Sequence, residues 1–178
     1  MPSRRFVLLH SPLLGPMAWR TVTAELTRRG HAAEAPAWPR LSGVAANFYA
    51  NLADHLVDEV AASGDPLILV AHSGAGALVP ALAARLTTPL AGVIFVDAIL
   101  PHPGRSWFDI APAGIRERLR AGAQMGELPS WDEGVAAGRY GWPLVRLSLH
   151  HLAMLTNPEP VADALESLAA RLTEPAHG

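Results

Sequence analysis

The sequence contains no cysteine among its 178 residues. Disulfide bonds, thiolate metal sites and a cysteine nucleophile are therefore excluded. Its eight histidines also lack the His-x-x-x-His and His-Glu-x-x-His spacings that are typical of zinc sites. We therefore expect no metal ion and no other cofactor.

An excess of charge of either sign is also missing. Fourteen Lys and Arg residues stand against sixteen Asp and Glu residues, which gives a formal net charge of −2, and the arginines are scattered along the chain. Binding to nucleic acid or to an acidic membrane surface generally depends on a clustered basic patch. The sequence therefore predicts neither partner.

Long apolar runs are absent as well. A membrane-spanning helix needs about 20 consecutive apolar residues, and no run approaches that length. Arg4 and Arg5 precede an apolar run that ends at Leu9, and this run is too short for the core of an export signal. We expect a cytoplasmic protein.

What the chain does contain is ample apolar material for a core. Half of its residues are apolar, and we expect a single domain over residues 1–178. Short apolar runs without alternation, each followed by a helical pattern, are typical of a parallel sheet covered on both faces. The predicted fold class is α/β, with a doubly wound, mostly parallel sheet of about five strands. The expected strands are residues 6–9, 32–35, 67–70, 93–96 and 144–147, and the expected helices are residues 19–29, 45–62, 77–86 and 158–172.

Residues 101–142 differ in texture from the rest of the chain. This segment is rich in proline and glycine and carries one charged helical patch at residues 115–121. We interpret it as a shortened cap within the domain. Its tryptophans, Trp107 and Trp131 among them, belong either to the core or to an apolar lid over an acyl or aromatic substrate.

A serine among small residues follows the third expected strand, in the order Ala71-His72-Ser73-Gly74-Ala75-Gly76. In doubly wound sheets, ligands bind at the carboxyl ends of the strands. A strained strand-to-helix turn that exposes a serine hydroxyl tolerates only small neighbours. The pattern therefore predicts a nucleophile, and a helix N-cap is the alternative role of Ser73. A phosphate cradle is weakly indicated, because the lysine of a P-loop is missing.

A serine hydroxyl becomes a nucleophile only when a base removes its proton. His150 and His151 directly follow the last expected strand, at a carboxyl end from which a side chain can face Ser73. His72 is the neighbour of Ser73 in the chain, so its side chain is expected to project away from the hydroxyl.

Three segments, in the same order along the chain, resemble parts of the α/β-hydrolases. Residues 9–19 resemble the oxyanion segment, residues 69–76 the nucleophile elbow, and residues 151–162 the segment of the catalytic histidine. Together they extend over most of the chain except the cap. The resemblance implies a reduced α/β-hydrolase fold with a short cap.

The resemblance also implies roles for individual residues. It makes Ser73 the nucleophile and His151 the base, with an oxyanion hole formed by the amide of Gly74 and a second amide in the first turn. The position at which the family usually supplies that second amide holds Pro12, which has no N–H. Leu13 is therefore our candidate for the second donor.

The acid of the triad is expected at Asp97, which ends the fourth expected strand. Some α/β-hydrolases carry their acid after this strand, and no further strand is evident between residues 101 and 144. Capping of the following turn is the alternative role of Asp97. Weaker candidates for the acid are Glu127, Asp132 and Glu133.

The sequence thus predicts a cofactor-independent serine hydrolase that acts on a carboxylic ester, thioester or lactone of a small-molecule acyl substrate. We place His10, Pro12, Trp107 and Trp131 in its substrate pocket. The alternative is a catalytically impaired binding protein of the same fold, or a non-hydrolytic cyclase or lyase that uses the same pocket. Loss of a strand exposes a sheet edge, which favours a homodimer.

Overall fold

The computed structural model describes residues 2–39, 48–60, 65–101, 117 and 141–172. The four strands in this part of the chain are β1 (Arg5–Leu9), β2 (Ala32–Glu34), β3 (Leu67–His72) and β4 (Leu90–Val96). The helices are η1 (Pro16–Trp19), α1 (Arg20–Arg28), α2 (Phe48–Val60), η2 (Ser73–Leu78), α3 (Val79–Ala83), α7 (Ala153–Thr156) and α8 (Pro158–Leu172). None of the described helices is both long and apolar enough to cross a membrane.

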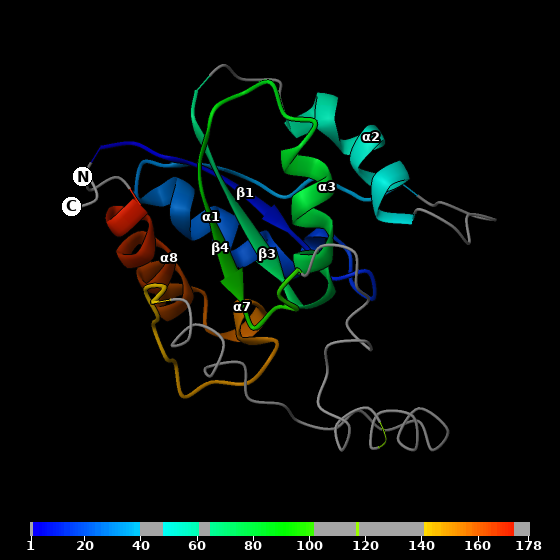
Figure 1. The fold of residues 1–178 in the computed structure, drawn as a ribbon. Helices are drawn as coiled ribbons and strands as arrows, with labels where there is room; N and C mark the ends of the chain where they lie inside the picture. Colours follow the sequence, from blue (N-terminus) through cyan, green and yellow to red (C-terminus); the bar gives the residue numbers. More distant parts are fainter. Residues whose placement is uncertain (1, 40–47, 61–64, 102–116, 118–140, 173–178) are drawn as a thin grey trace.

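The strands form one parallel sheet in the order β2-β1-β3-β4, and Figure 1 labels β1, β3 and β4 side by side. Phe6 and Leu8 of β1 pack in the core cluster that contains residues of α1 and α8, while Val7 and Leu9 pack with residues of α2 and α3. Because successive side chains of a strand point to opposite faces, a strand buried on both faces must be apolar throughout. The expected α/β class and doubly wound parallel sheet are confirmed.

The fifth strand expected over residues 144–147 is not formed, and the described sheet has four strands. A strand needs a neighbour to accept and donate its backbone hydrogen bonds. A cavity lined both by Phe95 of β4 and by Leu144 and Leu147 separates this segment from the sheet edge. Over so short a run, the sequence pattern shows only that the residues are apolar. It does not show whether another strand lies close enough to pair with them.

The helix expected over residues 77–86 is also divided. The chain leaves β3 at His72 and enters the 3-10 helix η2 at once, and α3 then ends at Ala83. The region after β3 is therefore a tight turn rather than the start of a regular helix.

The C-terminal part of the chain is anchored to α1. Arg29, directly after α1, donates hydrogen bonds to Glu25 at 2.7 Å and to Asp163 and Glu166 of α8 at 2.6 and 2.5 Å. His31 donates from Nε2 to Glu166 at 2.8 Å, because a carboxylate only accepts. The hydroxyl of Thr21 donates to the carbonyl of Met154 in α7 at 2.7 Å. These bonds fix α7 and α8, and with them the segment that precedes them, against the first half of the chain.

We expect Glu166→Gln to lower the free energy of unfolding by about 1.5–3 kcal/mol, because it weakens charge-assisted bonds from Arg29 and His31. Burial alone raises the pKa of Glu166, but these bonds outweigh it and hold the pKa below the ordinary 4.5. A carboxyl group with a lowered pKa in the folded protein stabilises it above pH 4.5, and this contribution is lost as the pH falls through the lowered value.

Urea unfolding of the wild type and the variant at a series of pH values measures this effect. The stability difference should shrink in acid, with Glu59→Gln on the exposed face of α2 as the matched control. A Glu166→Gln variant as stable as the control at neutral pH would contradict the anchoring role.

Candidate active site

The parallel register brings three strand ends to the same edge of the sheet. Leu9 pairs with Ala71, and His72 pairs with Val96. Adjacent strands lie about 4.8 Å apart. Ser73 and Asp97, each the residue after a paired position, therefore lie next to each other, with the turn after β1 on the other side of Ser73.

Ser73 directly follows β3 as the first residue of η2, and its backbone is strained. Its φ is 55°, in the left-handed region that residues with a side chain rarely adopt, which costs of order 1–3 kcal/mol. The amide of Ile99 donates to the carbonyl of Ser73 at 3.0 Å and ties this turn to the chain that leaves β4. A strained turn directly after a strand is the backbone geometry that the sequence predicts for a nucleophile elbow.

The small residues around Ser73 are required by close approach of the backbone. A Cβ added at Gly76 would lie 1.9 Å from the carbonyl oxygen of Ile99, and one added at Gly74 would lie 2.9 Å from Cδ of Pro12. Ala75 between them is fully buried. Glycine at position 76 allows the η2 backbone and the residue 97–99 turn to touch.

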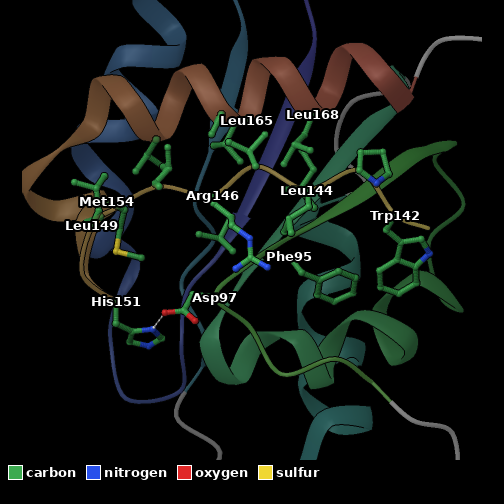
Figure 2. Close-up of a pocket in the computed structure, with 18 of the residues that line it drawn as sticks. Phe95, Asp97, Trp142, Leu144, Arg146, Leu149, His151, Met154, Leu165 and Leu168 are labelled. Carbon is green, nitrogen blue, oxygen red and sulfur yellow. Dashed lines mark hydrogen bonds and ion pairs between the residues drawn. The ribbon is translucent and has the colours of Figure 1, made fainter. Parts of the chain in front are cut away.

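His151 comes from the segment just before α7, more than 50 residues after β4 along the chain. Its Nδ1–H donates a short hydrogen bond to Oδ2 of Asp97, which Figure 2 marks with a dashed line. Because Nδ1 carries the proton of the neutral ring, Nε2 keeps a free lone pair that can accept a proton. The structure thus brings together the base and the acid that the sequence predicted.

The ring of His150 forms hydrogen bonds within the turn around α7 instead. Its Nδ1 accepts from the amide of Leu152 at 3.2 Å, so its Nε2 carries the proton and donates to Oγ1 of Thr156 at 3.0 Å. Thr156 in turn donates to the side chain of Asn157. Both ring nitrogens of His150 therefore hold the turn around α7, and neither is left as a base.

The other two histidines at this edge are buried. His72 is fully buried, and burial together with the charge of His151 lowers its pKa to about 4. Burial also lowers the pKa of His10, whose Nδ1–H donates to the carbonyl of Ser11 at 2.9 Å. Neutral rings at both positions surround the site without adding charge to it.

The hydroxyl of Ser73 makes no hydrogen bond to His151 within the part of the chain that the structure describes. Hydrogen bonds between a nucleophile and its base commonly tighten only when substrate is bound. The weaker candidates for the acid, Glu127, Asp132 and Glu133, lie outside the described residues. In the described residues, no group of three or more His, Cys, Asp or Glu side chains could hold a metal ion.

The first turn lies against the elbow through Pro12, whose ring approaches Gly74. The amide of Leu13 is 3.4 Å from Oγ of Ser11, which is a long hydrogen bond, and the Leu13 side chain is 85% exposed. Leu14 donates a shorter bond of 2.9 Å to the carbonyl of Ser11. The amide of Leu13 is thus held only weakly.

A cavity of about 940 Å³ reaches the Asp97–His151 pair. Figure 2 shows its apolar walls, which come from β4, from the segment between residues 142 and 150, and from α8. His10 and Pro12 do not line it, and Trp107 and Trp131 lie outside the described residues. Trp142, another tryptophan of the expected cap, does line the cavity, and the side chains that sequence reasoning missed include Phe95, Leu144, Leu165 and Leu168.

The apolar residues of this cavity wall are present in the sequence, but only the structure shows that they are exposed. Residues 142–149 carry four large apolar side chains that are 39–45% exposed, an unusual density outside a core. The apolar pattern of residues 144–147 by itself predicts a buried strand.

The comparisons with known proteins agree with this architecture. A pyrethroid hydrolase from Sphingobium faniae JZ-2 superposes with a TM-score of 0.69 at 18% identity, over 95% of this chain and 98% of that one. The chain has an α/β-hydrolase fold. An extracellular α/β-hydrolase from a Paenibacillus species superposes with a TM-score of 0.56 at 21% identity, over 69% of this chain and 52% of that one.

In sequence, the α/β-hydrolase-fold chain is 27% identical over 122 residues to a carbendazim hydrolyzing esterase of Nocardioides sp. (strain SG-4G). The match extends over 65% of this chain and 50% of the esterase, so the chain spans about half the length of this relative. No protein-family model matches the sequence.

In this fold we expect Gly76→Ala to lower the free energy of unfolding by about 1–3 kcal/mol, because the new methyl group collides with the carbonyl of Ile99. For a chain of this size, that corresponds to a decrease of roughly 2–12 °C in Tm. Gly15→Ala is the matched control, since nothing lies within 4 Å of a Cβ at that position. Thermal unfolding with equal Tm for the two variants would show that the elbow does not need glycine there.

Proposed function

We propose that this chain is a serine hydrolase that cleaves a carboxylic ester, thioester or lactone, with Ser73 as nucleophile, His151 as base and Asp97 as orienting acid. The observation that carries the proposal is the hydrogen bond from Nδ1 of His151 to Asp97, beside a serine held at positive φ. A base oriented by a carboxylate next to a serine hydroxyl is the arrangement that activates serine.

In the proposed reaction, Nε2 of His151 removes the proton of Ser73 as Oγ attacks the substrate carbonyl. Asp97 stabilises the imidazolium that forms, and the ring then gives its proton to the departing alcohol or thiol. Water, activated by the same Nε2, hydrolyses the acyl-serine and restores the hydroxyl. No cofactor is needed in this sequence of steps.

The negative charge on the carbonyl oxygen needs donors, and the amides of Gly74 and Leu13 are the ones we propose. Pro12 cannot donate. The hydrogen bond from the Leu13 amide to Ser11 is long, so little free energy is lost when this amide donates to a substrate instead. One such donor contributes about 2.7–4 kcal/mol to transition-state stabilisation.

The substrate we propose is a small molecule with an apolar acyl or aromatic part. The cavity beside Asp97 and His151 is walled by Phe95, Leu165 and Leu168. Its volume of about 940 Å³ is in the range of small-molecule pockets. Relatives of this fold named as an esterase and as a pyrethroid hydrolase support the same reaction class.

The nucleophile is tested by Ser73→Ala. We expect kcat on p-nitrophenyl esters to fall by about 10⁶-fold and covalent labelling by a fluorophosphonate to disappear, because the attacking oxygen is gone. Ser167→Ala, on the exposed face of α8, is the matched control and should keep both signals. A folded wild type that neither labels nor turns over would instead favour the binding protein or the non-hydrolytic enzyme.

The cavity is tested by Leu168→Trp, which fills part of its α8 wall. We expect the ratio of kcat/KM for p-nitrophenyl octanoate to that for p-nitrophenyl acetate to fall about 10-fold, since the longer chain loses apolar contact. Leu155→Trp, at an exposed position of α7 outside the cavity, is the control. An unchanged ratio would mean that the acyl chain binds elsewhere.

A further inference from the structure

His72 lies directly under the proposed active site but takes no part in its chemistry. It is the last residue of β3 and fully buried, and its ring makes an edge contact with Trp19 at 6.1 Å between centroids. The centroid of the His72 ring also lies 4.5 Å from the centroid of the His151 ring. A polar side chain buried so completely requires a reason for its position.

The reason is a hydrogen bond to the main chain of the base. Nε2 of His72 lies 3.0 Å from the carbonyl oxygen of His151. A carbonyl oxygen only accepts, so Nε2 must carry the proton and donate it. His151 is thus held at two points, its backbone by His72 from the end of β3 and its ring by Asp97 from the end of β4.

Among the described residues, this bond is the only hydrogen bond that the His72 ring makes. Nδ1 of His72 is buried and has no hydrogen-bond partner in the described part of the chain. In the tautomer with the proton on Nε2, Nδ1 carries only a lone pair. An unpaired acceptor in the core has a cost, and the bond to His151 must offset it.

His72 is neutral, which is favourable next to His151 because His151 becomes positively charged in the proposed reaction. The titratable groups that face it, in the described residues, are His151 and Asp97. Burial first, and then the charge of His151, lower the pKa of His72 to about 4, so it is neutral above pH 5. A neutral ring adds no repulsion when His151 becomes an imidazolium during the proposed reaction.

We propose that His72 is a positioning residue, which fixes the backbone of His151 through Nε2–H and so sets the reach of the base toward Ser73. This inference rests on the proposed function for its kinetic consequence. Its structural content, a single tautomer that holds the His151 segment, can be tested apart from activity.

The decisive pair of variants is His72→Gln and His72→Asn. The amide nitrogen of glutamine takes the place of ring Nε2, and that of asparagine takes the place of ring Nδ1, so only glutamine can restore the bond. We expect kcat of the Gln variant to stay within about 3-fold of wild type. The Asn variant should lose about 10–100-fold in kcat with little change in KM, as small misplacements of a catalytic group do.

A readout independent of activity is the proton resonance of His151 Nδ1–H in its bond to Asp97, assigned by its loss in Asp97→Asn. It should persist in His72→Gln and broaden or shift in His72→Asn. In the wild type, long-range proton–nitrogen correlation at pH 7 should show His72 neutral with its proton on Nε2.

The outcomes separate the two proposals. Folded Asn and Gln variants with the same kcat and the same His151 resonance would overturn the positioning role, as would a charged or Nδ1-protonated His72 in the wild type. Absence of Ser73-dependent turnover would overturn the proposed function alone, since the resonance and the tautomer still report on His72. If the Asn variant fails to fold, the positioning role is tested by the tautomer of His72 in the wild type and by the kcat and His151 resonance of the Gln variant.

Discussion

The parallel register of β3 with its two neighbours is the constraint on which the site depends. Pairing of His72 with Val96 makes Ser73 and Asp97 the next residues of adjacent strands. Both then turn away with positive φ, 55° and 44°, which releases their side chains at the sheet edge. A shift of one residue would turn every side chain of a strand to the opposite face and separate this pair.

The third member of the site depends on the opposite end of the chain. His151 arrives from a segment that contributes no strand, so no backbone ladder aligns it with Ser73. Its place is set by docking of α7 and α8 on α1, through Thr21 and the Arg29–Glu166 cluster, and by local bonds to His72 and Asp97. Ser73 and Asp97 are therefore positioned by the sheet, whereas His151 is positioned by side-chain contacts of the docked C-terminal segment.

The same division explains the cavity. Where residues 144–147 fail to pair with β4, the space between the sheet edge and α8 is lined by apolar side chains from three segments (Figure 2). Phe95 stacks on Trp142 with their planes 8° apart, which connects the edge strand with the start of the segment that leads to His151. The unpaired segment thus leaves an apolar space directly beside the Asp97–His151 pair.

Most of the sheet and two elements of the site follow from the sequence, because they are local in origin. Continuous apolar runs define strands buried on both faces. The small residues around Ser73 define a tight turn, and Asp97 ends its strand by position alone. The resemblance of three ordered segments to the α/β-hydrolases pointed to the fold and to His151.

Tertiary structure decided what depends on partners distant in the chain. It determined that the ring of His151 bonds to Asp97 and that the ring of His150 bonds within the turn around α7. It buried His72, whose Nε2–H donates to the backbone carbonyl of His151. It also left residues 144–147 unpaired, because an apolar run becomes a strand only where another strand lies within hydrogen-bonding distance. Sequence sets which residues can form an element, and only packing sets which groups meet.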